Sequence, residues 1–345
     1  MESETPERPS SRPRQAARPR SRARARRKRR TVIYVALATT VLVGGGVGTA
    51  AYTKTRSHGS NESQSVADTT TAGPSASSTT SAASSSGVSH AVAAKVSTEP
   101  AVDWDKALSD ALDNVTGGAD ARYSVAILDT KSGKSAVHGD GSYDTASIVK
   151  VDILASLLLQ AQDDNRHLTT QENAYAKVMI QNSDNTAATA LWKSIGYADG
   201  LEAANKRLGL TETAGGSGVL WGLTQTTAAD QLKLLKAVFG DSSVLSNASQ
   251  AYIQTLMGQV ETDQDWGVPS AATGDYAVKN GWLQRTTTLL WDINSIGRVT
   301  ADGHTYLVAV VSKGSTTQAK GIALVEEAAQ AAVKGFTKAA EEATS

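Results

Sequence analysis

The predicted strands of this chain lie at the two ends of one long stretch, and the sequence between them is helical. Apolar runs bounded by turn residues predict strands at 122–130, 135–139, 275–283, 286–299 and 304–314. Apolar residues recur at helical spacing from 147 to about 259, and helices are also predicted over 102–115 and 321–340. Strands from both ends bury their apolar faces by pairing in one sheet. The sequence therefore predicts an α+β fold, an antiparallel five-stranded sheet flanked by helices with an inserted all-helical lobe.

The first 100 of the 345 residues predict three segments of a different kind. Residues 1–30 hold 12 Lys and Arg, which predicts a basic cytoplasmic tail. Residues 31–52 carry no charge and are long enough to cross a bilayer, so they predict a transmembrane anchor. A cleaved signal peptide and a twin-arginine export signal are the alternatives. Residues 53–100, rich in Ser, Thr and Ala, predict a disordered linker.

An anchor at 31–52 predicts a single-pass protein of the cell membrane that contacts the membrane through this segment. Under every alternative, the domain over 101–345 lies outside the cytoplasm. That domain holds 19 basic and 28 acidic side chains, a balance that argues against a nucleic-acid partner. The chain has no cysteine, its five histidines lack metal-site spacing, and no glycine-rich phosphate loop occurs. We therefore expect neither a metal nor a cofactor.

One predicted helix carries a lysine where an apolar residue would be expected. In SIVKVDILASLLLQ, residues 147–160, the helical face of Lys150 also holds Ser147, Ile153 and Leu154. Lysine is almost never fully buried unless it is paired. Burial disfavours its charged form and lowers its pKa, which suits a base that activates a neighbouring hydroxyl. The alternative is a helix cap followed by a lysine that extends its ammonium to solvent.

Two further motifs follow this one in order along the chain. S-I-V-K at 147–150 begins a helix, S-D-N at 183–185 lies in a loop, and K-N-G at 279–281 lies on a strand. With these motifs the domain resembles the penicillin-recognising serine enzymes, and most closely the class A β-lactamases. The stretches 167–196 and 223–235 resemble the helices around the family's S-D-N loop and the helix after its Ω-loop.

The resemblance implies catalytic roles for three side chains. It implies that Ser147 is the nucleophile, Lys150 its base, and Ser183 a proton relay to the leaving nitrogen. The oxyanion would lie between the backbone N–H groups of Ser147 and Trp282.

The resemblance also implies substrate-binding residues. Asn185 would hold the amide on the acyl side of the substrate. Lys279 and Asn280 would bind a substrate carboxylate, and Gly281 completes this third motif. Trp282, the next residue, is expected either beside the substrate or in the core.

The chain departs from the class A pattern at three places. Asn280 stands where the family has Thr or Ser, and only 36 residues separate Ser147 from Ser183. The stretch 211–227 corresponds to the Ω-loop, but it lacks the family's Glu-x-x-x-Asn, and Glu212 is its only acid. The family's Glu activates the water that removes the acyl group. Unless Glu212 replaces it, rather than being a solvated charge, we expect deacylation to be slow.

These features predict an extracytoplasmic, membrane-tethered serine hydrolase or acyltransferase that forms an acyl-Ser147 intermediate. Its substrate would be a small molecule or a cell-wall peptide, with β-lactam-like amides included, and it would be a poor β-lactamase. The alternative from another class is a non-catalytic binding or sensing module of the same fold, which the altered third motif and the missing Ω-loop acid favour. Convergence of the Ser147, Lys150 and Ser183 polar atoms would favour the enzyme.

Overall fold

The structure is a computed structural model that describes residues 102–343. The predicted tail 1–30, membrane segment 31–52 and linker 53–100 lie outside the described residues. Within 102–343, none of the helices combines the length and the apolar character needed to cross a membrane.

A five-stranded antiparallel sheet forms the centre of the fold, in the order β2-β1-β7-β6-β5. Its strands are β1 (Arg122–Asp129), β2 (Ser135–His138), β5 (Tyr276–Gln284), β6 (Trp291–Ala301) and β7 (His304–Ser315). β1 pairs with β7, so the first and the last segments of the domain are hydrogen-bonded neighbours. The apolar faces of the early and the late strands are thereby buried in one sheet.

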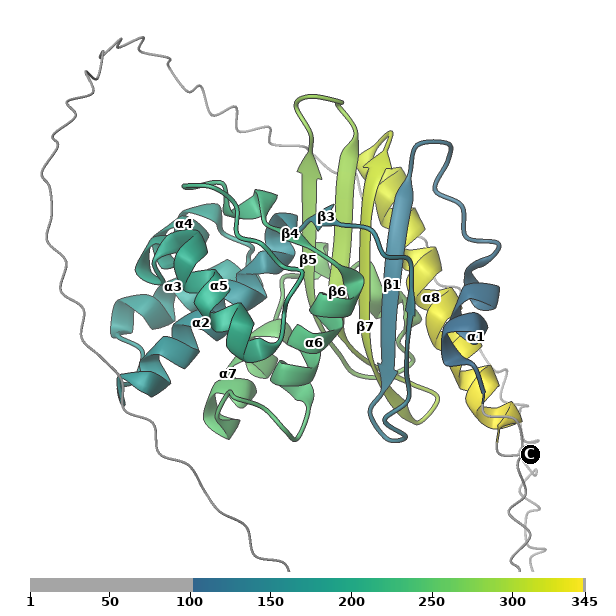
Figure 1. Ribbon diagram of the computed structural model, residues 1–345, viewed down its shortest axis with the longest axis horizontal. Helices are drawn as coiled ribbons and strands as arrows, with labels where there is room; N and C mark the ends of the chain where they lie inside the picture. Colours follow the sequence, from purple (N-terminus) through teal and green to yellow (C-terminus); the bar gives the residue numbers. More distant parts are fainter. Residues whose placement is uncertain (1–101, 344–345) are drawn as a thin grey trace, which may run out of the picture. The chain divides into compact units, whose positions relative to one another are not determined.

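Helices cover both faces of this sheet. The helices are α1 (Trp104–Leu112), α2 (Val149–Asp163), α3 (Thr170–Gln181), α4 (Asn185–Ser194), α5 (Tyr197–Leu208), α6 (Ala228–Phe239), α7 (Asn247–Met257) and α8 (Gln318–Glu342). Figure 1 shows α1 and α8 on one side of the sheet and the lobe of α2 to α7 on the other. Together with the sheet, this arrangement confirms the predicted fold class.

Alternation along the strands divides the core in two. On β7, Leu307 and Ala309 pack with the helical lobe, whereas Val308 and Val310 pack with the residues of α8. Successive side chains of a strand point to opposite faces. The same alternation on β5 decides which residues of the K-N-G motif can meet the lobe.

Two local features differ from the sequence-based expectation. A second, two-stranded sheet pairs β3 (Tyr143–Asp144) with β4 (Gln225–Thr226), and such short strands carry no readable periodicity. The strand predicted over 286–299 begins only at Trp291, because the residues before it form the hairpin turn, where Leu289 has a φ of 59°.

A buried carboxyl group on α2 leads to a prediction about stability. Asp152 is fully buried, and within residues 102–343 neither of its oxygens has a hydrogen-bond partner. Burial is the main cause that raises its pKa to about 8; the Asn205 amide opposes this shift, and the charge of Asp230 adds to it. The folded protein therefore keeps a proton that the unfolded chain releases above its own pKa near 4. This carboxyl accordingly loses its stabilising contribution as the pH rises from about 4 to about 8.

Replacing Asp152 with asparagine removes this titration, because the amide is neutral throughout. We expect the free energy of unfolding of Asp152→Asn, relative to wild type, to rise by about 1 kcal/mol per pH unit over that range. Denaturant unfolding at pH 4.5, 6 and 7.5 measures this difference. Ser156→Ala, at a buried position on the same helix without a titratable group, is the control, and its difference from wild type should not change with pH. A difference for Asp152→Asn that is constant with pH would contradict the prediction.

Candidate active site

Lys150 lies in the first turn of α2, directly after the 3-10 turn Ala146–Ile148. Its side chain is fully buried in the structure. Its Nζ donates to the Ser183 carbonyl oxygen at 2.6 Å, to Ser183 Oγ at 3.0 Å and to Asn185 Oδ1 at 2.9 Å. Three acceptors match the three N–H groups of an ammonium, so the lysine does not extend to solvent.

Ser183 joins the two lysines of the site. Its Oγ accepts hydrogen bonds from Lys150 Nζ and from Lys279 Nζ, both at 3.0 Å. Lys279 lies on β5, and only 1% of it is exposed. Ser183 has a φ of 55°, a left-handed conformation that is uncommon outside glycine and is concentrated at functional sites. This turn holds the hydroxyl between the two amines.

The surroundings of both amines disfavour their positively charged forms. Burial, followed by the charge of Lys279, lowers the pKa of Lys150 well below its usual value, and Asp184 opposes this shift. Burial lowers the pKa of Lys279 to about 7. A neutral amine accepts a proton, so the two groups and the Ser183 hydroxyl between them form a chain along which protons can move.

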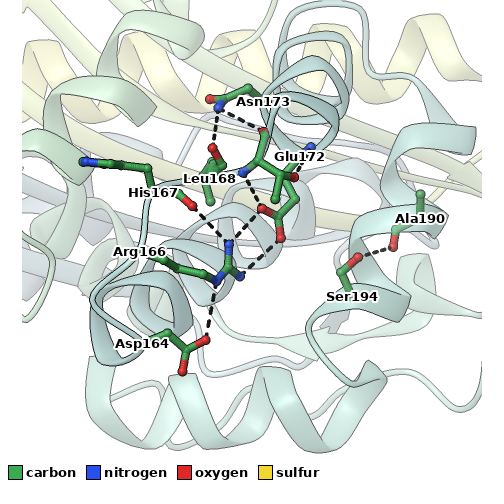
Figure 2. A network of polar contacts seen from close by, with 9 residues as sticks. Asp164, Arg166, His167, Leu168, Glu172, Asn173, Ala190 and Ser194 are labelled. Atoms are coloured by element: carbon green, nitrogen blue, oxygen red, sulfur yellow. Dashed lines mark hydrogen bonds and ion pairs between the residues drawn. The ribbon is translucent and has the colours of Figure 1, made fainter.

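The helix that precedes the S-D-N loop is fixed at its other end by a polar network (Figure 2). Arg166 Nη1 donates to Glu172 Oε2 at 2.9 Å, and Arg166 Nε lies 3.4 Å from Asp164 Oδ2. Glu172 also forms a capping box with Thr169 at the start of α3. The short connection between α2 and α3 is therefore tied down, and α3 delivers Ser183 just beyond its C-terminus.

Ser147 lies in the 3-10 turn, one turn before Lys150, and only 9% of it is exposed. Ala146, which precedes it, has a φ of 47°. In the described part of the chain, Ser147 Oγ makes no hydrogen bond. The expected convergence is thus present between Lys150 and Ser183, whereas the Ser147 hydroxyl is bonded to neither of them.

A close backbone contact and a buried amide hold the turn before Ser147. A Cβ atom at Gly281 would lie 2.7 Å from both the Ser147 nitrogen and the Thr145 oxygen, so β5 lies directly against this turn. Asn294, opposite Gly281 on β6, donates from Nδ2 to the carbonyl oxygens of Asp144 and Thr145 at 2.9 and 3.0 Å. The position of Asn294 could not be predicted from the sequence, because only the pairing register reveals it.

The other two residues of the third-motif region point to the opposite face of β5. Asn280 Nδ2 donates to the carbonyl oxygens of Gln264 and Trp266 at 2.8 and 2.9 Å, which uses both of its N–H donors. The ring of Trp282 packs 6.0 Å from that of Trp266, with the residues on the α8 side of the sheet. The Asn280 side chain therefore points away from the lobe, and the partly buried Trp282 ring packs against the core on the α8 side, since side chains alternate along a strand.

The segment corresponding to the Ω-loop places a tryptophan, and not its acid, next to Lys150. Glu212 is exposed, and its Oε2 accepts from Thr227 Oγ1 at 3.4 Å. The centre of the Trp221 ring lies 4.9 Å from Lys150 Nζ. Trp221 is half-buried, and no periodicity in this loop could have placed it over Lys150.

Comparison with known proteins gives a family match over most of the described chain. A family model described as "Beta-lactamase enzyme family" matches residues 107–173 and 173–336. A Mycobacterium tuberculosis protein named as a lipoprotein, LppW, is 29% identical over 171 residues, 47% of this chain. A protein of the same name from Mycobacterium bovis matches to the same extent. The chain spans about half the length of these curated relatives, 54%.

Solved structures with the same fold come from several sources. A β-lactamase from Xanthomonas campestris is 20% identical with a TM-score of 0.55, and the match covers 66% of this chain and 97% of that one. PBP-A is 18% identical with a TM-score of 0.57, covering 68% and 96%. A class A β-lactamase from Bacteroides cellulosilyticus is 15% identical with a TM-score of 0.58, covering 68% and 99%. At these identities the similarity establishes the fold.

Proposed function

Since the chain belongs to the beta-lactamase enzyme family, we propose that Ser147 is the nucleophile of a serine hydrolase or acyltransferase that acts on amides or esters. The placement of Lys150 carries this proposal. Its side chain is fully buried one turn from Ser147, and its amine contacts Ser183 Oγ at 3.0 Å. An amine with a lowered pKa in this position suits a general base.

The reaction begins with attack of Ser147 Oγ on the substrate carbonyl carbon, while the hydroxyl proton passes to the Lys150 amine. Rotation about the Ser147 Cα–Cβ bond directs the hydroxyl towards that amine, since residues three apart are neighbours on a helix. The bond to the leaving nitrogen then breaks, and that nitrogen takes a proton from Ser183, which regains one from Lys150. An ester of Ser147 remains.

The substrate class follows from the charges of the site. Protonated Lys279 binds a substrate carboxylate. Asn185 contacts the amide on the acyl side of the substrate through the part of its side chain that is not bonded to Lys150. Cell-wall peptides and β-lactam-like amides combine these two groups. A solved variant of PBP-A, 19% identical to this chain, is an acyl-enzyme complex with penicillin G. A penicillin is therefore a suitable probe for this site.

We place this activity on an extracytoplasmic domain attached to the membrane. The lipoprotein name of the LppW relatives supports membrane attachment. This chain has no cysteine to carry a lipid, so the uncharged segment 31–52 supplies the anchor in our proposal.

A second candidate function is a non-catalytic binding or sensing module of the same fold. It is favoured by the Ser147 hydroxyl, which makes no hydrogen bond among the described residues, and by the Asn280 side chain, which points away from the site. In such a module Lys150 and Lys279 would bind an anionic ligand without forming a covalent bond.

The deciding experiment is intact-protein mass spectrometry of the full chain after incubation with a penicillin, beside the Ser147→Ala variant. We expect a stable adduct of the drug's mass on the wild type and none on the variant. An adduct that persists on Ser147→Ala would refute Ser147 as the nucleophile. No adduct and no loss of the drug would favour the binding module.

A further inference from the structure

The most unusual contact of the site is the indole that covers the Lys150 amine. Trp221 begins the short 3-10 helix Trp221–Leu223, and its ring centre lies 4.9 Å from Lys150 Nζ. Its Nε1 donates to Thr189 Oγ1 at 3.1 Å, and Thr189 Oγ1 donates in turn to the Asn185 carbonyl oxygen at 2.9 Å. The ring is therefore fixed to the same helix, α4, that begins at the S-D-N motif.

The indole completes the enclosure of Lys150. The amine donates to three protein acceptors, and the side chain is 0% exposed although Trp221 itself is only half-buried. A cation beneath an aromatic ring gains up to about 2 kcal/mol, which would favour the ammonium. Burial, followed by the charge of Lys279, acts in the opposite direction and lowers the pKa of Lys150. The ring thus lies over the amine as a cover that separates it from solvent water.

Among residues 102–343, the acids that lie closest in the sequence to these motifs are engaged in other contacts. In residues 102–343, no carboxylate forms a hydrogen bond with Ser147 or Lys150. Glu212, the only acid of the loop that carries Trp221, accepts from Thr227. Asp184 accepts from the Ala187 nitrogen at 2.6 Å and caps α4.

We propose that Trp221 excludes water from the Lys150 side of the acyl-Ser147 intermediate and thereby sets its lifetime. The inference rests on the proposed function, in which Ser147 is acylated. In deacylation, a water oxygen attacks the ester carbonyl carbon and its proton passes to the Lys150 amine. The bond between the acyl carbon and Ser147 Oγ then breaks, Ser147 Oγ takes that proton from Lys150, and the acyl group leaves as a free acid. Trp221 keeps this water out. An acceptor molecule that carries a nucleophilic group therefore competes better with water for the acyl group.

The test measures the lifetime of the penicillin adduct on the full chain, by intact mass after removal of free drug. We expect Trp221→Ala to shorten the lifetime by about tenfold or more, since it admits water beside the base, and Trp221→Phe to keep it within about threefold of wild type. Thr189→Val removes the acceptor of the indole N–H but preserves the side-chain volume, and should give an intermediate lifetime. Trp291→Ala, which removes a half-buried indole from the other face of the sheet, is the matched control and should leave the lifetime unchanged.

A second measurement separates water exclusion from mere structural support. Opening the site relieves the burial that lowers the pKa of Lys150, so the pH midpoint of acylation should move upward in Trp221→Ala. A folded Trp221→Ala with the wild-type lifetime and midpoint would overturn the inference. If that variant does not fold, wild-type behaviour of Thr189→Val would overturn it. A wild type that forms no adduct and leaves the drug intact would instead refute the proposed function.

Discussion

Lys150→Met should lower the rate of Ser147 acylation by about three orders of magnitude, which is within the range that general base catalysis contributes. Methionine preserves the length and the burial of the side chain but has no amine to take the serine proton. The wild-type rate should rise with pH through a midpoint well below the usual lysine value, because burial and Lys279 lower the pKa of this amine. The variant should lack that midpoint. Stopped-flow acylation with a chromogenic penicillin between pH 5 and 9 measures both effects.

The Lys150→Met variant should still fold. In the wild type, the buried Lys150 amine has a lowered pKa. Above that pKa the unfolded chain binds more protons than the folded protein does. The free energy of unfolding of the wild type therefore rises as the pH rises towards 10.5. Methionine has no such pH dependence. Lys193→Met, at an exposed position on α4, is the control and should acylate at the wild-type rate. Acylation of Lys150→Met within about tenfold of wild type would assign the base to another group.

The sequence was sufficient for the features that depend on local pattern. The apolar runs at both ends of the domain predicted the five strands, and β1 pairs with β7 because neither strand can bury its apolar face alone. Lys150 was conspicuous because its helical face is otherwise apolar. The two-residue strands β3 and β4 carry no such pattern, since two residues show no period.

The site was predicted less completely, because several of its contacts depend on tertiary placement. Strand alternation puts Lys279 and Gly281 on the lobe face of β5 and Asn280 on the other, and roles taken from the family resemblance overlooked this. Asn294 reaches the turn before Ser147 only through the register of β6 with β5. Trp221 comes from a loop whose path is set by packing and not by its residues alone.

The close contact of β5 with the turn of the nucleophile predicts a large effect of one methyl group. In Gly281→Ala the new Cβ would lie 2.7 Å from the Ser147 nitrogen and 2.9 Å from the Ile148 nitrogen. These are backbone atoms that no side-chain rotation can move, so the turn itself must shift away from β5. The shift displaces both the Ser147 hydroxyl and its N–H, and a lost oxyanion donor alone typically costs about a hundredfold to a thousandfold in rate.

We therefore expect Gly281→Ala to acylate at least about a hundredfold more slowly than wild type, in the same stopped-flow assay. Gly274→Ala is the control, because its Cβ would meet only Thr300, at the ordinary contact distance of 3.5 Å, and it should acylate normally. Reversible binding of a slowly reacting penicillin separates the two possible causes of a slow rate. If binding is kept while acylation falls, the displaced turn is responsible, because Lys279 is still in place on β5. Wild-type acylation by a folded Gly281→Ala would show that the position of this turn against β5 is not needed for the reaction.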